Sequence, residues 1–205
     1  ADMKGAEGFG EVENGLVALD LDEWEGFVFA RFSKDGPGLR AHLGDFADRM
    51  ASHRPGDMRC TWRITLDVAC NWKLILENAV ETYHTGIVHK NTVGAQQSRT
   101  LPTVGNWIAI QVISGRSIAT LTDEVPPFDP IAGLDEDARA GTYFTVVLPT
   151  VQFAVAQDCL WWLNTVPVSE TRTMLEVGGC FPADRLAQPD FDWRAAPYYD
   201  RWERV

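Results

Sequence analysis

The second half of the chain is dominated by short β-strand patterns that follow one another closely. Apolar runs rich in β-branched and aromatic residues occur at 143–148, 151–156, 159–166 and 174–181. Strands at such short spacing are typical of antiparallel neighbours, because a parallel pair needs a long crossover connection. An antiparallel sheet is therefore the feature that most constrains the fold.

The first half adds further strands. Two strands are expected at 16–19 and 24–32, joined by an acidic turn at 20–23. Apolar and polar residues then alternate strictly over 59–68, which predicts a strand with one buried face.

Helical patterns occur in three places. An apolar period predicts a helix over 39–52, and a second helix of about 14 residues is expected over 71–85. A third is expected over 198–205, with Pro197 in its first turn, where the missing N–H has no helical partner. Helices combined with a run of antiparallel strands predict an α+β fold.

Two connections after residue 106 are interpreted from their composition. Ser-Gly-Arg between 107–113 and 117–121 predicts a hairpin. Residues 122–141 contain six Asp or Glu, three Pro and two Gly, which predicts a long exposed loop, typical of a lid or a binding loop.

Composition limits the classes of function. With 45% hydrophobic and 11% aromatic residues, the chain can bury a core. The net charge of −11 and the lack of a basic run argue against a nucleic-acid partner. No apolar stretch approaches the roughly 20 residues of a membrane span, and no apolar signal sequence opens the chain. The net charge also argues against an anionic substrate, although the local charge in the pocket decides whether one is accepted.

The cysteines give no metal-binding or disulfide pattern. Cys60, Cys70, Cys159 and Cys180 lie far apart, and none forms a Cys-x-x-Cys or Cys-x-His pair. Their apolar, strand-like neighbours predict buried, reduced thiols in a cytoplasmic protein.

Residues 70–89 carry the side chains best suited to chemistry. On a continuous helix Glu77, Glu81 and His84 would lie within about 60° of one another. His84 and His89 would not share that face, but a helix end at Gly86 would let His89 fold back toward His84. Two imidazoles and a carboxylate with open positions form the facial triad of non-haem iron oxygenases. The adjoining apolar stripe is expected to contain Leu76, Val80, Tyr83 and Ile87.

Spacing alone leaves other interpretations open. The acidic residues also fit a solvated helix face. The histidine pair beside carboxylates also fits a zinc hydrolase with Glu81 as general base, although the His-Glu-x-x-His signature is missing.

A family resemblance narrows the choice. The mononuclear-iron motif of the oxygenase alpha subunits of Rieske non-haem iron oxygenases resembles Asn71-Trp72-Lys73, Glu77-Asn78, Glu81 and Tyr83-His84-x4-His89. Residues 24–29 resemble the strand that follows the Rieske domain in that family. Residues 198–202 resemble the start of the helix that carries the third iron ligand.

The resemblance implies a curved antiparallel sheet packed on helices, the helix-grip or START-like fold. It implies that His84 and His89 are ligands to Fe(II). Glu81 would bridge toward a Rieske-cluster histidine of the neighbouring subunit, and Asn78 would approach the iron without firm ligation. Glu81 and Asn78 are thus the expected catalytic residues.

The resemblance also implies a division of the chain. Residues 1–13 are expected to be a linker from a missing N-terminal Rieske domain. Residues 14–205 are expected to be the mononuclear-iron catalytic domain, truncated at the C-terminus. The third ligand, an Asp, is expected just beyond Val205, because the in-chain candidates Asp158, Asp192 and Asp200 match the family position poorly. The fragment alone would bind iron weakly and be inactive.

The implied activity is hydroxylation or oxidative demethylation of a small organic substrate, aromatic in part of the family, by dioxygen activated at Fe(II). Electrons would come from NAD(P)H through a separate reductase, with or without a ferredoxin, and through a [2Fe-2S] Rieske cluster in the missing domain. The working assembly would be a homotrimer. An alternative is a helix-grip small-molecule binding module without catalysis, which needs no histidine pair.

The substrate pocket is expected among the C-terminal strands. Phe153, Trp161, Trp162 and Asn164 are candidate walls, but strand alternation prevents Trp161 and Trp162 from both facing inward.

Overall fold

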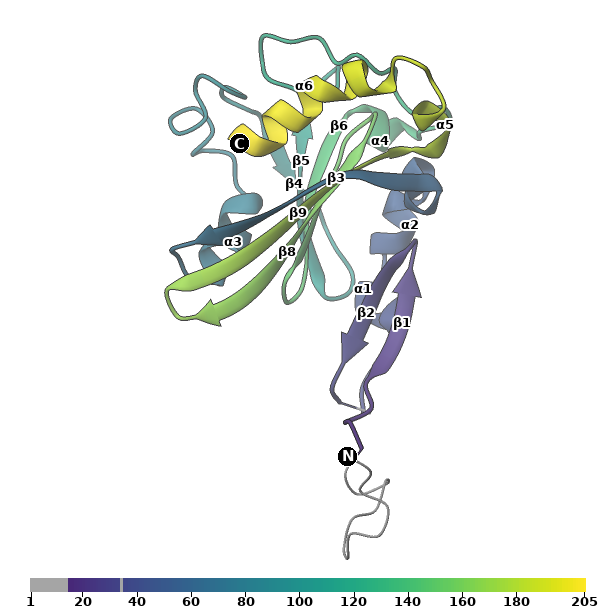
Figure 1. Cartoon of the computed structure of the whole chain (residues 1–205), viewed down its shortest axis with the longest axis vertical. Coiled ribbons are helices and arrows are strands. Elements are labelled where there is room, and N and C mark those ends of the chain that lie inside the picture. The colour runs from purple at the N-terminus through teal and green to yellow at the C-terminus, as the bar shows by residue number, and fades with distance from the viewer. Residues whose placement is uncertain (1–14, 34) are drawn as a thin grey trace, which may run out of the picture.

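A seven-stranded antiparallel sheet forms the centre of the computed structural model, which describes residues 15–33 and 35–205 (Figure 1). Its strand order is β3 (Met58–Val68), β9 (Arg172–Pro182), β8 (Leu160–Ser169), β7 (Val151–Val155), β6 (Gly141–Val147), β5 (Trp107–Ile113) and β4 (Ser98–Thr100). The predicted α+β fold with an antiparallel sheet is therefore confirmed. The proposed linker at 1–13 lies outside the described residues.

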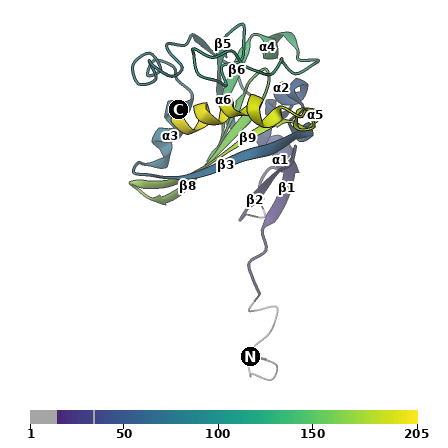
Figure 2. The ribbon, with the colours of Figure 1, turned by 45° about the horizontal axis from the view of Figure 1, so that its top comes forward.

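The two faces of the sheet are covered by different parts of the chain (Figures 1 and 2). The hairpin of β1 (Asp20–Trp24) and β2 (Phe27–Arg31) covers one face together with α1 (Leu39–Leu43) and α2 (Phe46–Met50). The other face carries α3 (Trp72–Ala79) and the long α6 (Phe191–Arg204). The short elements are the 3-10 turns Ala51–His53 and Pro55–Asp57, α4 (Glu136–Arg139) and α5 (Ala183–Leu186).

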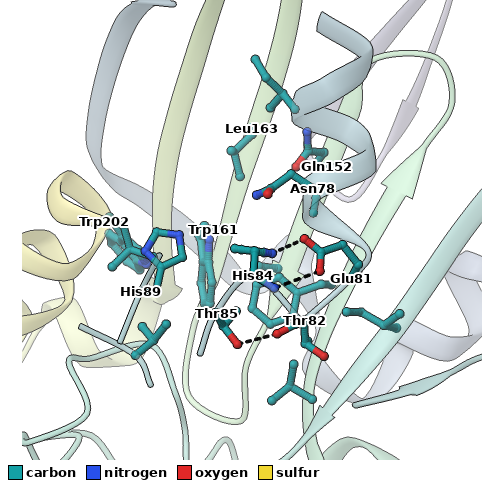
Figure 3. Close-up of a pocket in the computed structure, with 18 of the residues that line it drawn as sticks. Asn78, Glu81, Thr82, His84, Thr85, His89, Gln152, Trp161, Leu163 and Trp202 are labelled. Carbon is teal, nitrogen blue, oxygen red and sulfur yellow. Dashed lines mark hydrogen bonds and ion pairs between the residues drawn. The ribbon is translucent and has the colours of Figure 1, made fainter. Parts of the chain in front are cut away.

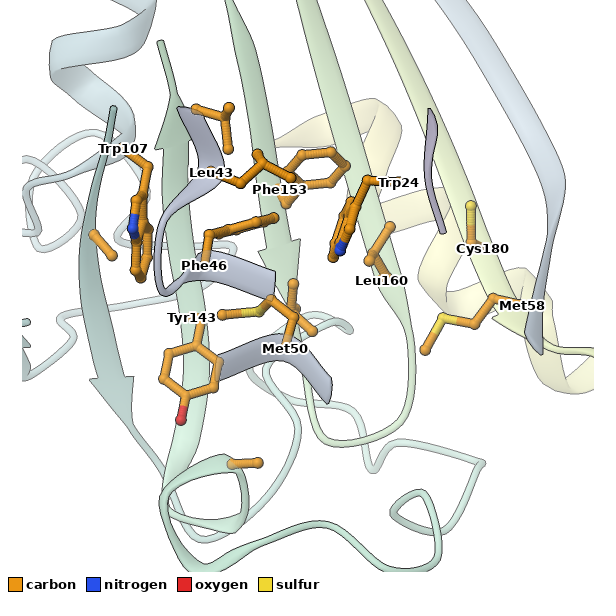
Figure 4. Close-up of a cluster of buried hydrophobic side chains, with 14 of the residues drawn as sticks. Trp24, Leu43, Phe46, Met50, Met58, Trp107, Tyr143, Phe153, Leu160 and Cys180 are labelled. Carbon is orange, nitrogen blue, oxygen red and sulfur yellow. The ribbon is translucent and has the colours of Figure 1, made fainter. Parts of the chain in front are cut away.

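Aromatic rings fill the core beneath α2 (Figure 4). Phe46 lies at its centre, with ring centroids 4.8 Å from Trp24, 5.2 Å from Trp107 and 5.5 Å from Phe153. Burying a side chain of this size contributes about 1.5–3 kcal/mol, so this cluster fixes the N-terminal elements to the sheet.

A second aromatic cluster lies beneath α6. Phe181 of β9 packs against Tyr198 at 5.1 Å and against Trp202 at 5.7 Å between ring centroids. Phe128, from the segment before α4, packs against Phe181 at 5.2 Å. The C-terminal helix is thereby held across the sheet, which positions one wall of the cavity described below.

Three predicted boundaries near the N-terminus were wrong. Residues 16–19 form no strand; β1 begins at Asp20, and the hairpin turn is Glu25-Gly26, both with positive φ. The predicted helix over 39–52 is broken at Gly44 into α1 and α2. A Cβ at Gly44 would lie 1.8 Å from the carbonyl oxygen of Val104, so this close backbone contact, invisible to periodicity, ends α1.

The prediction for 107–141 was partly wrong. Residues 117–121 form no strand, and β5 pairs instead with β4 and β6. The segment 122–141 is not a fully exposed loop, because Phe128, Ile131 and Leu134 are buried. Its acidic residues face solvent while its apolar residues complete the two cores.

The C-terminal helix is longer than predicted. It begins at Phe191, so Pro197 lies inside it rather than in its first turn. Proline removes one backbone hydrogen bond at that point. Packing of Phe191, Tyr198 and Trp202 against the sheet on both sides of the proline keeps the helix in place.

Strand β3 and the cysteines differ from expectation in burial. Because β3 is an edge strand, Trp62 and Ile64 are only half-buried and Leu66 is exposed, so this face of the strand is less buried than predicted.

All four cysteines are free, as predicted, but only Cys159 and Cys180 are buried.

None of the helices within the described ranges combines the length and the apolar character that crossing a membrane requires.

Buried His53 makes stability depend on pH. The side chain is 1% exposed, and neither ring nitrogen has a hydrogen-bond partner among the described residues. Burial lowers the pKa of His53 from 6.5 to about 4. Below pH 6.5 the unfolded chain takes up a proton that the folded chain refuses, so stability is complete above pH 6.5 and falls toward pH 4. The expected loss between pH 6.5 and 5 is about 2 kcal/mol.

Urea unfolding at pH 7 and pH 5 measures this loss. His53→Phe, whose ring can pack edge-on to Tyr143 as the imidazole does, is expected to remove about 2 kcal/mol of the difference. His42→Gln, at a half-buried histidine, is the control and should keep the wild-type difference. An unchanged difference in His53→Phe would contradict the assignment.

Candidate metal centre

Helix α3 leads into the candidate site and is shorter than predicted. The Asn71 side chain caps it by accepting a hydrogen bond from the Lys73 N–H at 3.0 Å, and its Nδ2 donates to the Glu170 carbonyl at 2.9 Å. The helix ends at Ala79 rather than at 85. The predicted helical row of Glu77, Glu81 and His84 is therefore wrong, and Glu77 is exposed.

The expected apolar stripe also ends early. Leu76 is buried and Val80 is half-buried, but Tyr83 is 83% exposed and Ile87 is 81% exposed. Both lie beyond the end of α3, so the helical spacing that grouped them with Leu76 does not hold there.

Consecutive turns after α3 bring the two histidines together. The carbonyl of His84 accepts from the N–H groups of Ile87 and Val88, and that of His89 accepts from Thr92 at 3.0 Å. The imidazole ring centroids of His84 and His89 are 5.4 Å apart (Figure 3). The return toward His84 is thus made by these turns and not by a helix break at Gly86.

Glu81 fixes the orientation of His84. Its Oε1 contacts Nδ1 of His84, and its Oε2 accepts the backbone N–H of His84 at 3.3 Å (Figure 3). This contact leaves Nε2 of His84 as the ring nitrogen available to a ligand. Histidines that bind metals commonly hold their other ring nitrogen against a carboxylate in this way.

His89 is suited to remain neutral. Burial lowers the pKa of His89, and the nearby charges of His84 and Arg201 lower it further. A metal binds the unprotonated imidazole, so a lowered pKa keeps a lone pair available at neutral pH.

Both histidines line a cavity of about 250 Å³ between the sheet, α3 and α6. Its sheet wall is apolar and includes Ile110, Val112, Phe144, Leu163, Leu175 and Val177. Asn78, Thr82, Thr85 and Gln152 add polar groups (Figure 3). Such a mostly apolar pocket with a few polar groups is typical of a small-molecule site.

The predicted wall residues divide between the two faces of the sheet. Trp161 lines the cavity, and Trp162 faces the opposite side, where the Arg63 guanidinium lies over its ring at 5.2 Å. The expectation that the two tryptophans face apart holds. The prediction that Asn164 forms a wall of the pocket was wrong, because its side chain donates a hydrogen bond to Glu176 on the opposite face of the sheet. Phe153 borders the cavity, but its ring packs against Trp24 and Phe46.

None of the in-chain aspartates considered as a third ligand lines the cavity. Asp158 is buried, which raises its pKa, and it accepts from the hydroxyls of Ser117 and Tyr198, each at 2.5 Å. Asp192 and Asp200 are exposed. Within residues 15–33 and 35–205, no three His, Cys, Asp or Glu side chains form a metal-binding group. Two imidazoles backed by a carboxylate fit the donor set of Fe(II), one ligand short of a facial triad.

Two polar residues at the cavity were missed from the sequence. Arg201 and Gln152 both line it, and both are buried. The spacing of Tyr198, Arg201 and Trp202 places them on one helical face, which is the signal that could have identified Arg201.

Parts of the chain match known proteins in sequence. Residues 56–205 match the family described as the catalytic domain of the ring-hydroxylating alpha subunit. The carnitine monooxygenase oxygenase subunit of Acinetobacter pittii is 31% identical over 85 residues, which is 40% of this chain and 23% of the relative. The anthranilate 1,2-dioxygenase large subunit of Burkholderia cepacia is 35% identical over 86 residues, which is 40% of this chain and 19% of the relative.

Solved structures share the fold. A quaternary ammonium Rieske monooxygenase has a TM-score of 0.72 at 19% identity, covering 97% of this chain and 52% of that chain. Naphthalene 1,2-dioxygenase from Rhodococcus sp., bound to indole, has a TM-score of 0.63 at 15% identity, covering 90% and 49%. At these identities the likeness shows the fold alone. The chain spans less than a quarter of the two relatives above and about half of these structures.

Proposed function

The chain belongs to the family of ring-hydroxylating alpha subunits, within their catalytic domain, and on that basis we propose that it is the mononuclear-iron part of a Rieske-type oxygenase. The substrate would be a small organic molecule that is hydroxylated or oxidatively demethylated. The observation that carries the proposal is the pair of neighbouring imidazoles of His84 and His89 at a mostly apolar cavity, with His84 held by Glu81.

Each residue of the site has a distinct part in this proposal. His84 and His89 would hold Fe(II), which when bound supplies dioxygen activation. Glu81 holds His84 through Nδ1 and, in the whole protein, would extend toward a Rieske-cluster histidine of a neighbouring subunit. Asn78 lines the same cavity and would approach the iron without firm ligation. The apolar sheet wall would exclude water from the substrate.

The third ligand is proposed to be an Asp beyond Val205. Glu81 is engaged with His84, and Asp158, Asp192 and Asp200 do not line the cavity. Val205, which follows α6, lines the same cavity as the histidine pair. Because two imidazoles alone bind iron weakly, this chain by itself would be inactive.

The whole protein would need partners for its electrons. We propose a [2Fe-2S] Rieske cluster in a preceding domain, NAD(P)H with a reductase or ferredoxin, and a homotrimer in which Glu81 faces the next subunit. The four free cysteines support a cytoplasmic location. Sedimentation of the whole protein as a clean monomer would contradict the bridging role of Glu81.

Metal content of anaerobically purified protein tests the function directly. It is measured for this chain and for a longer chain that continues past Val205. Iron near one per chain only in the longer form is the expected result. Zinc at full occupancy, with activity that needs no dioxygen, would indicate a hydrolase instead. No metal in either form would leave a helix-grip binding module as the better account.

Glu81 is expected to act on metal binding through His84. Glu81→Leu, which removes the contact to Nδ1, should weaken Fe(II) affinity of the longer chain about 10–100-fold, and Glu81→Gln, which keeps an acceptor, should weaken it less. Anaerobic Fe(II) titration measures both. Glu77→Gln, at an exposed position on α3, is the matched control and should match wild type. If Glu77→Gln and Glu81→Leu lowered the Fe(II) affinity equally, the loss would come from the change in net charge and not from the contact between Glu81 and His84.

A further inference from the structure

Arg201 places a buried positive charge at the cavity. It lies on α6, is 5% exposed and lines the same cavity as His84 and His89. Burying an ionised group is costly unless it is paired, so its partners decide what it does there.

The contacts of Arg201 leave most of its guanidinium unpaired. Its Nε donates to the Ile118 carbonyl at 3.1 Å, and its guanidinium carbon lies 4.7 Å from the centre of the Trp161 ring. No carboxylate of the described residues forms an ion pair with it. Asp200, its neighbour in sequence, pairs instead with Arg204 at 2.8 Å. Arg201 therefore keeps terminal N–H groups free for a ligand.

Other donors at the cavity are also without partners. Nε2 of Gln152 and Nε1 of Trp202 are buried, and neither has an acceptor among the described residues. Glu81, the acidic side chain at the cavity, is already engaged by His84. Buried donors without partners therefore gather at this cavity, and a ligand with acceptor oxygens would suit them and the Arg201 guanidinium.

We propose that Arg201 binds the carboxylate of an organic acid whose apolar part lies against the sheet wall of this cavity. The inference rests on the proposed function, because it assigns a substrate class to the same site. A guanidinium presents a planar fork that matches a carboxylate with two parallel hydrogen bonds. The apolar wall of Ile110, Phe144 and Leu163 favours an organic acid over an inorganic anion.

The position of Arg201 also orients such a ligand. Arg201, the next residue Trp202 and both histidines line the same cavity, where Figure 3 draws Trp202 and His89. A carboxylate held there places the apolar body of the acid next to the histidine pair. The positive charge of Arg201 would thus let the cavity accept an anion, although the chain carries a net charge of −11.

Calorimetric titration of the metal-free chain tests the proposal without iron or turnover. Three acids, benzoate, phenylacetate and cyclohexanecarboxylate, are compared with their amides, which match them in shape but carry no charge. At least one acid is expected to bind at least tenfold more tightly than its amide. Arg201→Gln should abolish that preference, and Arg201→Lys should keep part of it.

Arg204→Gln is the matched control, because it removes the same charge from an exposed position on the same helix. It should leave the preference unchanged. The proposal is overturned if no acid is preferred over its amide, if Arg201→Gln keeps the preference, or if inorganic phosphate binds as tightly as the acids. If Arg201→Gln fails to fold, the proposal is judged from the preference of the wild type for an acid over its amide and from the part of that preference that Arg201→Lys keeps.

The outcome is separable from that of the metal experiment. A preference for acids without iron binding in the longer chain would support Arg201 and refute the oxygenase function. Iron binding without a preference for acids would refute only the role of Arg201.

Discussion

Replacing His84 or His89 with alanine is expected to lower the Fe(II) affinity of the longer chain at least about a hundredfold. Each substitution removes one of two neighbouring imidazoles whose centroids lie 5.4 Å apart, and it leaves a single histidine at the cavity. Losing a proposed ligand should cost more affinity than Glu81→Leu, which disturbs only the orientation of His84. Anaerobic Fe(II) titration with iron counted per chain measures the effect.

His42→Ala is the control for this experiment. His42 lies on α1 and bonds the Leu148 carbonyl through Nε2 at 2.8 Å, away from the cavity. It should bind iron as wild type does. If His42→Ala loses as much iron as His84→Ala, the loss reflects general unfolding. If His84→Ala and His89→Ala both keep iron, the metal centre proposed here is wrong.

Gly179→Val is expected to destabilise the fold by at least about 3 kcal/mol. Gly178 and Gly179 are neighbours in β9, and a tryptophan packs close to each of them, on opposite faces of the sheet. A Cβ at Gly179 would lie 1.9 Å from the Trp202 ring, and one at Gly178 would lie 2.3 Å from the Trp162 ring. Because Trp202 docks α6 and lines the cavity, the substitution should also displace the cavity wall.

Urea unfolding followed by tryptophan fluorescence measures this change. Gly115→Ala is the matched control, since an added Cβ there meets nothing within 4 Å, and its effect should stay within about 0.5 kcal/mol. If Gly179→Val unfolded at the same urea concentration as wild type, Trp202 would have moved aside with little loss of folding free energy. That result would weaken the assignment of α6 as a fixed wall of the site.

The sequence by itself determined the elements whose pattern is local. Alternation and short turns located β6, β7, β8 and β9, because neighbouring antiparallel strands need only their own residues and tight connections. The same holds for the motif that contains Glu81, His84 and His89, which the structure brings together at one cavity. These features are encoded by residues close together in the chain.

The tertiary structure alone decided what depends on distant contacts. The carbonyl of Val104 requires glycine at position 44 and so splits the helix predicted over 39–52. Packing on the sheet buries Phe128 in a segment whose composition predicts exposure, and it makes Pro197 internal to α6.

The charge of the cavity was decided in the same way. The spacing of Arg201 with Tyr198 and Trp202 indicates the buried face of α6, but the fold decides that Arg201 on this face lies over Trp161, 40 positions earlier in the chain. Periodicity reports which face of an element is apolar, but it does not report which distant element covers that face. For this reason the sequence could indicate the candidate site residues Glu81, His84 and His89, whereas the position of Arg201 at the same cavity required the fold.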